Sequence, residues 1–226
     1  MDFENVYLQA MSIIKNITSL KKNLPSKVEL VAVSKTKPIE DLEAAYIAGQ
    51  RIFGENKIQE MVSKWEQLPK DIHWHMIGHV QTNKVKFMAP FVDLIHAVDS
   101  LKLLKEIQKQ ALNNNRIIKC LLQIRIAKEE TKFGFPAEEI DSLIETSKSL
   151  PNIAITGLMG MASFTEDKQQ VRKEFMSLAT LFNKFTDLHK GCEILSMGMS
   201  GDYQIAIEEG SNMIRVGSKI FGERTY

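Results

Sequence analysis

Residues 30–54 of the chain read LVAVSKTKPIEDLEAAYIAGQRIFG, two short apolar runs separated by a polar segment. The first run, Leu30–Ser34, is typical of a buried strand. Pro38 opens the middle segment, which has helical periodicity, and Gly49 ends it. Arg51–Gly54 then forms a second short strand. A strand, a helix and a strand in this order predict a parallel pair, because the crossover returns the chain to the edge where it started.

The same alternation continues to the end of the chain. Further strands are predicted at His73–Ile77, Val92–Ala97, Ile117–Ile126, Ile153–Leu158, Glu193–Leu195 and Met213–Val216, and further helices at Lys57–Gln67, Asn83–Met88, Leu101–Leu112, Ala137–Ser149, Asp167–His189 and Tyr203–Glu209. Eight strands, each with a helix or room for one, favour an α/β fold of the closed (β/α)8 TIM-barrel type, with an open doubly wound sheet as the alternative. Apolar residues at helical spacing from Phe3 to Leu20 predict an extra N-terminal helix. No linker divides residues 1–226, which indicates a single domain.

The composition excludes several classes of protein. The formal net charge of the 226-residue chain is +1, so no strong field for nucleic acid or for an anionic membrane is expected. No apolar segment reaches the roughly 20 residues that span a membrane, and acidic residues near the N-terminus argue against a signal peptide. Cys120 and Cys192 fit no zinc motif, and no other set of residues has metal-ligand spacing. We expect a cytoplasmic protein that holds no metal and keeps Cys120 as a buried free thiol.

Lys35 follows the first predicted strand directly. Because ligand sites of (β/α)8 barrels lie at the carboxyl ends of the strands, this ammonium group is expected at the open end of the barrel. A lysine in a partly desolvated site can form an imine with an aldehyde. The alternative is a lysine that merely extends its charge to solvent at a strand end. Lys37 is a weaker candidate, because it adjoins the proline that opens the helix.

Two segments with glycine and serine lie at the ends of the seventh and eighth strands, at Ser196–Asp202 and Arg215–Gly222. This pair of loops is the place where barrels bind phosphate, since glycines let backbone N–H groups approach an anion and serines add hydroxyl donors. Ordinary turn and capping chemistry is the alternative. Together the two loops predict a phosphate site.

Arg215 lies between two apolar residues of the last strand, where an unpaired charge would be very costly. It either forms an internal ion pair with a barrel carboxylate such as Glu55 or contacts a bound ligand. His96, at the end of the fourth strand, could line the open end of the barrel or form a structural hydrogen bond. Lys132 reads as a solvated loop lysine, although it could offer a second ligand site.

The order of these residues resembles the pyridoxal phosphate homeostasis protein family, also called proline synthetase co-transcribed homologues. The pieces that carry the resemblance span nearly the whole chain and are Ala32–Pro38, Phe53–Asn56, Trp74–Gly78 with Gln81 and Asn83-Lys84, Gly157–Met159, Leu195–Ser200, and Arg215–Gly217 with Ile220–Gly222. Three departures from the family are modest. Ser218 stands where a threonine is usual, and Gly201 where an acidic residue is frequent. Residues 160–162, Gly-Met-Ala, differ from those usual after the sixth strand.

The resemblance implies a barrel similar to the N-terminal domain of alanine racemase that binds pyridoxal 5′-phosphate (PLP). It implies that Lys35 carries PLP as a Schiff base and that Arg215 faces the pyridine nitrogen. Ser200, Gly217 and Ser218 would hold the phosphate, and Asn56 would lie beside the ring. An arginine cannot give up its proton, so the ring nitrogen would stay unprotonated and PLP would be a poorer electron sink.

Two functions compete on this resemblance. The first is a PLP carrier without catalytic residues, which takes part in PLP homeostasis and supplies PLP to the apo-forms of PLP-dependent enzymes. The alternative is an amino-acid racemase, which needs a base on each face of the substrate. In alanine-racemase-like enzymes the second base comes from a further domain and a partner subunit, and we expect that domain to be absent, because the sequence stops at Tyr226. A barrel enzyme with an aldolase-type lysine is a third, weaker option. The resemblance favours the carrier and a monomer.

Overall fold

The computed structural model describes residues 3–127 and 133–223, and within them eight parallel strands close a barrel in chain order. The strands are β1 (Glu29–Val33), β2 (Ile52–Glu55), β3 (His73–Met76), β4 (Leu94–Val98), β5 (Ile118–Ile124), β6 (Ile153–Gly160), β7 (Ile194–Met199) and β8 (Met213–Val216). The pairing of β1 with β8, with Leu30 opposite Ile214, closes the sheet. The predicted (β/α)8 barrel is therefore confirmed, and the open doubly wound sheet is excluded.

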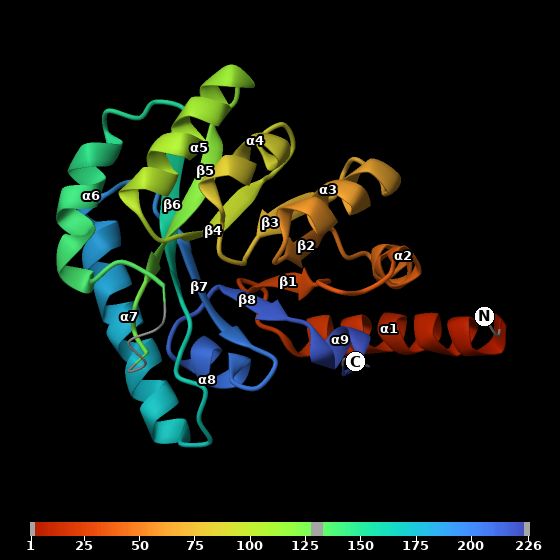
Figure 1. Ribbon diagram of the computed structural model, residues 1–226. Coiled ribbons are helices and arrows are strands. Elements are labelled where there is room, and N and C mark those ends of the chain that lie inside the picture. The colour runs from red at the N-terminus through yellow and green to blue at the C-terminus, as the bar shows by residue number, and fades with distance from the viewer. Residues whose placement is uncertain (1–2, 128–132, 224–226) are drawn as a thin grey trace.

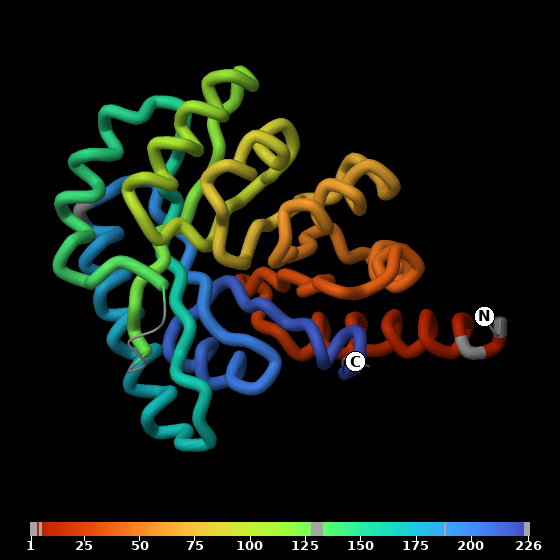
Figure 2. Tube along the Cα trace, viewed as in Figure 1, coloured from red at the N-terminus to blue at the C-terminus, as the bar shows by residue number. Residues whose placement is uncertain are grey.

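Helices surround the barrel (Figure 1). They are α1 (Phe3–Asn23), α2 (Ile39–Ile47), α3 (Ile58–Gln67), η1 (Thr82–Lys84), α4 (Val85–Met88), α5 (Leu101–Asn113), η2 (Ala137–Glu139), α6 (Ile140–Ser147), α7 (Lys168–Leu188), α8 (Tyr203–Glu208) and α9 (Ser218–Phe221). The predicted extra helix is α1, which precedes the first strand. It packs against α2 and against α9, where Asn16 Nδ2 donates to Ile220 O at 3.0 Å. Helices α1 and α9, from the two halves of the chain, therefore lie on the same side of the barrel (Figure 2).

The apolar core has two layers, because successive side chains of a strand point to opposite faces of the sheet. The larger cluster lies between the strands and the helices that cover them. The smaller one takes the alternate residues of the strands and therefore fills part of the barrel interior. Its buried members are Val31, Leu94, Ala97, Leu121, Met159 and Met213. Polar side chains share this interior with them, namely His75, His96, Ser196 and Arg215, and all four are buried.

Strand β7 is longer than the sequence predicts. The expected strand ended at Leu195, with a loop from Ser196 onward, but β7 continues to Met199. Its pairing with β8 shifts register between Ser196 and Met199, and Gly198 has a φ of +95°. A Cβ atom on Gly198 would lie 2.6 Å from the Cβ of Ala206 in α8. The glycine thus permits an irregular strand against a closely packed helix, and Ser196 belongs to the barrel interior.

Three further expectations concern cysteines, membranes and metal ions. Both cysteines are free and buried, and burial raises the pKa of the Cys120 thiol to about 12. Among the described residues no helix has the length and apolar character that crossing a bilayer requires, and no cluster of three His, Cys, Asp or Glu side chains could hold a metal ion.

Candidate functional site

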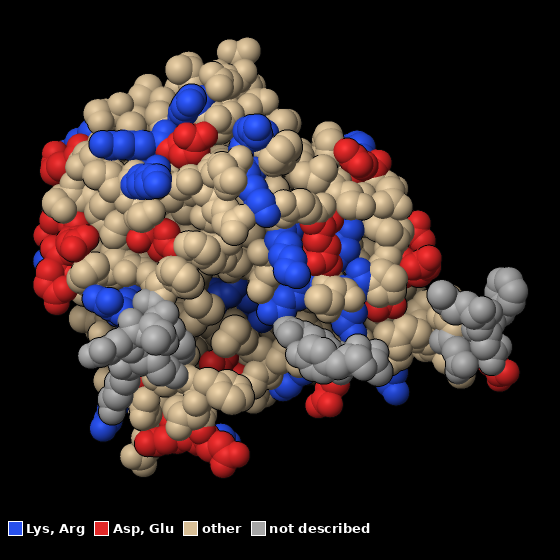
Figure 3. All heavy atoms as spheres, in the orientation of Figure 1, with Lys and Arg blue, Asp and Glu red and all other residues tan. Residues whose placement is uncertain are grey.

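A cavity of about 550 Å³ opens at the carboxyl ends of the strands. Its lining comes from β1, β5, β7 and β8 and the segments that follow them, and from the segments after β2, β3 and β6. The six residues that the family resemblance assigns to PLP all line it: Lys35, Asn56, Ser200, Arg215, Gly217 and Ser218. Figure 3 shows basic atoms gathered around and within a hollow on this face. Residues far apart in the sequence therefore meet in one site.

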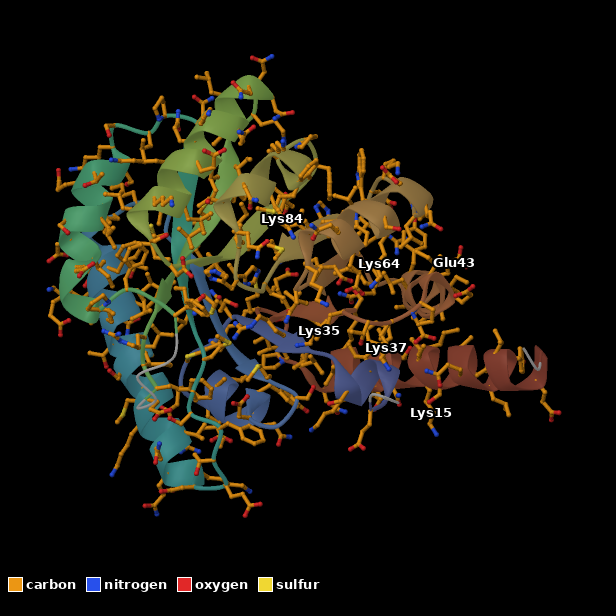
Figure 4. All side chains as sticks on the ribbon, in the orientation of Figure 1. Lys15, Lys35, Lys37, Glu43, Lys64 and Lys84 are labelled. Atoms are coloured by element: carbon orange, nitrogen blue, oxygen red, sulfur yellow. The ribbon has the colours of Figure 1, made fainter. Side chains whose placement is uncertain are left out.

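Lys35 occupies the turn after β1, two residues beyond the end of the strand, and is half-buried. The next residue, Thr36, has a φ of 64°, a conformation that is uncommon for a residue other than glycine. The Thr36 backbone N–H donates to Glu60 Oε1 at 2.5 Å, which anchors the turn to α3. Figure 4 shows Lys35 and Lys37 from this turn and Lys64 from α3.

A buried ionic cluster lies under this turn. Lys64 Nζ donates to Glu55 Oε1 at 2.8 Å, to Glu60 Oε1 at 2.7 Å and to Ser34 O at 2.8 Å. Ser34 Oγ also donates to Glu55 Oε1, at 2.6 Å. Burial raises the pKa of Glu55, and the neighbouring Lys64 ammonium opposes this shift. The suggestion that Glu55 pairs with Arg215 is wrong, since Lys64 from α3 is its partner.

The two loops after β7 and β8, which the sequence predicts as a phosphate site and which are called the phosphate-type loops below, touch each other. The Gly217 backbone N–H donates to Ser200 Oγ at 3.2 Å. A Cβ atom on Gly217 would lie 3.2 Å from Val33 O, so the loop after β8 also packs tightly on the end of β1. Ser218, which follows, is exposed. Helices α8 and α9 have only six and four residues, so hydroxyl and N–H groups, rather than helix dipoles, are the anion-binding features here.

Arg215 is buried, with 4% of its surface exposed, yet its side chain reaches the cavity. Its Nη1 donates to Ser196 Oγ at 2.6 Å and its Nη2 to Gly160 O at 3.0 Å. Burial lowers the pKa of Arg215 to about 10, while the carboxylate of Asp202 acts in the opposite direction. The side chain is therefore a cation at neutral pH. Among the described residues it forms no ion pair, and neutral oxygens accept these two hydrogen bonds.

Another part of the cavity lining contains residues for which the sequence predicts no role. His79 stacks on Phe133, with ring centroids 4.1 Å apart, and His79 Nδ1 lies 2.8 Å from Asp99 Oδ2. Gln123 in β5 also lines the cavity and donates from Nε2 to Phe133 O at 2.8 Å. A polar residue in the apolar run 117–126 was the one available signal for Gln123. The contact of His79 with Phe133 joins segments far apart in the chain and had none.

The remaining candidates, His96, Lys37 and Lys132, are not the main ligand-binding residues. His96 is fully buried and does not line the cavity. Both of its ring nitrogens have hydrogen-bond partners inside the barrel, so the prediction of a structural hydrogen bond is the correct one. Lys37 lines the cavity, but its Nζ donates to Phe221 O at 3.0 Å and ties the turn after β1 to α9. Lys132 lies outside the described residues.

The fold and the position of the cavity define a class, the (β/α)8-barrel proteins whose ligand site lies at the carboxyl ends of the strands. The family described as "Alanine racemase, N-terminal domain" matches residues 8–225. The chain is 40% identical over 200 residues to the pyridoxal phosphate homeostasis protein of Aquifex aeolicus (strain VF5), covering 88% of each chain. It is 41% identical over 206 residues to that of Synechocystis sp., covering 89% of this chain and 94% of the relative. The chain belongs to the family of pyridoxal phosphate homeostasis proteins.

Solved structures agree with this assignment. PipY of Synechococcus elongatus PCC7942, determined with PLP bound, is 33% identical and superimposes with a TM-score of 0.86, covering 93% of this chain and 100% of PipY. Alanine racemase from E. faecalis superimposes with a TM-score of 0.75 over 95% of this chain and 58% of the racemase. At 16% identity, this second likeness concerns the fold alone.

Proposed function

We propose that this protein binds PLP in the cavity and acts as a carrier that serves PLP homeostasis. One observation carries the proposal: a lysine, a buried arginine and two joined serine-glycine loops line the same cavity. PLP has an aldehyde, a ring nitrogen and a phosphate, and each matches one of these features chemically. The PLP-bound structure of the relative PipY supports the same assignment.

The residues present fit this ligand. When bound, PLP supplies an aldehyde with which a lysine amine condenses, and Lys35 is the lysine we assign. Ser200 and Ser218 hydroxyls and the Gly217 backbone would hold the phosphate, in a place where a side chain on Gly217 would crowd Val33 O. Arg215 would face the ring nitrogen, and Asn56 would lie beside the ring. The cavity of about 550 Å³ lies within the usual range for small-molecule sites.

A carrier, rather than a catalyst, is favoured by the charge of Arg215. Carbanion chemistry on PLP needs an electron-poor ring, and a guanidinium group that keeps its proton leaves the ring nitrogen unprotonated. The same contact does not weaken binding. We therefore propose that the protein holds PLP without serving as an amino-acid racemase and supplies it to apo-enzymes. A single domain, a monomeric state and a cytoplasmic location are parts of the same proposal.

Spectral titration with PLP and with pyridoxal, which lacks the phosphate, tests the site. We expect PLP to bind far more tightly than pyridoxal. Ser200→Ala should weaken PLP binding about 10- to 150-fold, since a hydrogen bond to a charged group contributes roughly 1.5–3 kcal/mol. The same variant should leave pyridoxal binding nearly unchanged.

The comparison of the two ligands serves as its own control. A general distortion of the cavity by Ser200→Ala would weaken both ligands equally. Equal affinity of the unaltered protein for PLP and pyridoxal would place the phosphate elsewhere and refute the assignment of the two loops.

A further inference from the structure

A line of polar side chains crosses the barrel interior and ends at the cavity. Arg215 Nη1 donates to Ser196 Oγ at 2.6 Å. Ser196 Oγ lies 3.0 Å from His96 Nδ1, and His96 Nε2 lies 3.0 Å from His75 Nδ1. Beyond this pair, His75 Nε2 lies 3.6 Å from Asp93 Oδ2, an electrostatic contact slightly longer than a hydrogen bond. The residues come from β8, β7, β4 and β3 and from the residue before β4.

This line of polar side chains, called the polar chain below, is costly to bury. Its four inner members are between 0% and 4% exposed, and they share the interior with the smaller apolar cluster. Barrels of this type usually fill that space with branched apolar side chains, which need no partners. A buried polar network is tolerated only when its members satisfy one another. Stability alone therefore gives no reason for the polar chain, whereas its contact with a cavity-lining arginine does.

The two ends of the polar chain set the direction of every hydrogen bond in it. A guanidinium group can only donate, so Ser196 Oγ accepts from Arg215 and its own proton is available for His96 Nδ1. His96 then carries its proton on Nε2 and donates to His75 Nδ1. His75 in turn carries its proton on Nε2, which faces the carboxylate of Asp93. A carboxylate can only accept, so this direction leaves no lone pair facing another.

The reverse direction fails at the Asp93 end. If His96 donated from Nδ1, its Nε2 would have to accept from His75 Nδ1–H, and the bare Nε2 of His75 would face the Asp93 carboxylate. Burial lowers the pKa of both His75 and His96, so neither ring is expected to carry a second proton at neutral pH. The other titratable neighbours are His73 and Lys119 near Asp93, and both act to lower the pKa of Asp93.

We propose that Ser196 and His96 are positioning residues, and that this row of hydrogen bonds holds the Arg215 guanidinium towards the ring nitrogen of PLP. In this arrangement His75 and His96 are both neutral Nε2–H tautomers. This inference rests on the proposed function. Without the polar chain, Arg215 would keep only its bond to Gly160 O and could rotate away from the ring. Ser196 and His96 themselves lie outside the set of side chains that line the cavity.

The tautomers are tested first, without any PLP. Protein labelled with ¹⁵N-histidine is studied at pH 7 by long-range ¹H–¹⁵N correlation, with His75→Gln and His96→Gln used to assign the signals. We expect both rings in the neutral Nε2–H form. An Nδ1–H tautomer or an imidazolium at either position would overturn the polar chain.

The positioning role is tested by a cycle of variants and ligands. Ser196→Ala is compared with Ser211→Ala, which removes another buried hydroxyl, one bonded to the backbone of β7 and β8 but not to the polar chain. The ligands are PLP and its analogue with C–H in place of the ring nitrogen. Ser196→Ala should weaken PLP binding about tenfold, as expected for a lost hydrogen bond to a charged group, and change the absorption of the bound PLP. The analogue should be affected by no more than about twofold, and Ser211→Ala should not distinguish the two ligands.

The outcomes separate this inference from the function on which it rests. If the unaltered protein does not bind PLP, the proposed function fails and the positioning role fails with it. If it binds PLP but Ser196→Ala weakens PLP and the analogue equally, only the positioning role is refuted. If Ser196→Ala does not fold, the tautomer measurement on the ligand-free protein still tests the proposed direction of the hydrogen bonds.

Discussion

Arg215 is a buried cation held by neutral oxygens, and its environment explains how one residue can serve a bound ligand. An unpaired charge in a protein interior is expensive. Burial lowers the pKa of this guanidinium only to about 10, so the charge persists. Two hydrogen bonds, to Ser196 Oγ and Gly160 O, fix the group at the edge of the cavity. A ligand atom that accepts a hydrogen bond would complete its set of partners.

Lys35 is the residue to which we expect PLP to become attached. We expect borohydride reduction of the PLP-loaded protein to place a pyridoxyl group on Lys35, because it lines the cavity beside the joined loops. Digestion and mass spectrometry would locate the label. Lys37 is the matched control, since it lies two residues further on but donates to backbone oxygens of α9 and of the residues that follow it.

The two lysine variants should differ in a simple way. Lys35→Ala should abolish the label, and Lys37→Ala should retain it. A pyridoxyl group found mainly on Lys37 or Lys132 would contradict the assignment.

At the scale of elements, the site depends on contacts that tie strands to helices. The turn that holds Lys35 is fixed by Glu60 and Lys64 of α3, a helix that follows the next strand. The extended β7 is allowed by Gly198 and brings Ser196 into the barrel. Each of these elements is short, so its geometry is set by its neighbours more than by its own propensity.

Lys64→Met tests the buried ionic cluster. The side chains of Lys64 and Glu55 are 6% and 0% exposed, so loss of the ammonium leaves a buried carboxylate without its cation. We expect the free energy of unfolding to fall by about 3–5 kcal/mol, measured by urea denaturation. Lys148→Met removes a surface partner of Glu145, where both side chains are more than half exposed, and should cost at most about 0.5 kcal/mol. Equal effects of the two variants would refute a structural role for the cluster.

Asp93 supplies a prediction about pH. Its contact with His75, helped by Lys119, lowers the pKa of Asp93 from 3.8 to about 2. A carboxyl group whose pKa is lower in the folded state stabilises the protein above the unfolded pKa, and this contribution is lost as the pH falls through the folded pKa. Because the side chain is one-third exposed, we discount the shift for solvent screening. Asp93→Asn should cost about 1–2 kcal/mol at pH 7, and the difference should shrink between pH 4 and pH 2.

Urea unfolding at pH 7 and at pH 3 would measure both quantities. Asp71→Asn is the control, because Asp71 pairs with Arg51 at the surface and its side chain is 57% exposed. A difference for Asp93→Asn that does not change with pH would show that the ionised carboxylate is not its source.

At the scale of the whole molecule, barrel closure places the first and last strands beside one site. The turn after β1 packs on the loop after β8, and α1 and α9 lie against each other (Figure 1). Lysine, arginine and the phosphate-type loops therefore meet only when the last strand pairs with the first. PLP binding should consequently depend on the complete, closed barrel.

The carrier function is itself a prediction at this scale. Incubation of the PLP-loaded protein with L- and D-amino acids should give near-background racemisation, decarboxylation and transamination, scored by chiral chromatography. Transfer of PLP to an apo-enzyme, with a scavenger for free PLP, should restore its activity. The physical reason is the arginine assigned to the ring nitrogen, which disfavours carbanion chemistry.

A Lys35→Ala variant belongs beside both measurements, because any exposed PLP gives weak side reactions. Turnover in the ordinary range of about 1–10³ s⁻¹ would favour a racemase-like enzyme instead. Absence of transfer would leave a PLP store, which is still not an enzyme.

The sequence by itself determined the barrel, because the alternation of apolar strands with amphipathic helices is a local property. The last strand, Met213–Val216, has the predicted bounds, and α1 appears where helical spacing predicts it. The positions of Lys35 and of the two loops after the last strands also indicated the cavity, since ligand sites of barrels follow their strands, and the family resemblance implied the full set of six lining residues.

Only the tertiary structure decided which polar groups pair inside the barrel. Lys64 rather than Arg215 is the partner of Glu55, and Ser196 lies in a strand rather than in a loop. His96 proves to be a link between His75 and Ser196, which are far apart in the chain. These partnerships depend on strand register and barrel closure, and a one-residue shift of register would turn each side chain to the other face. A linear pattern specifies which residues are buried, but not which of them meet.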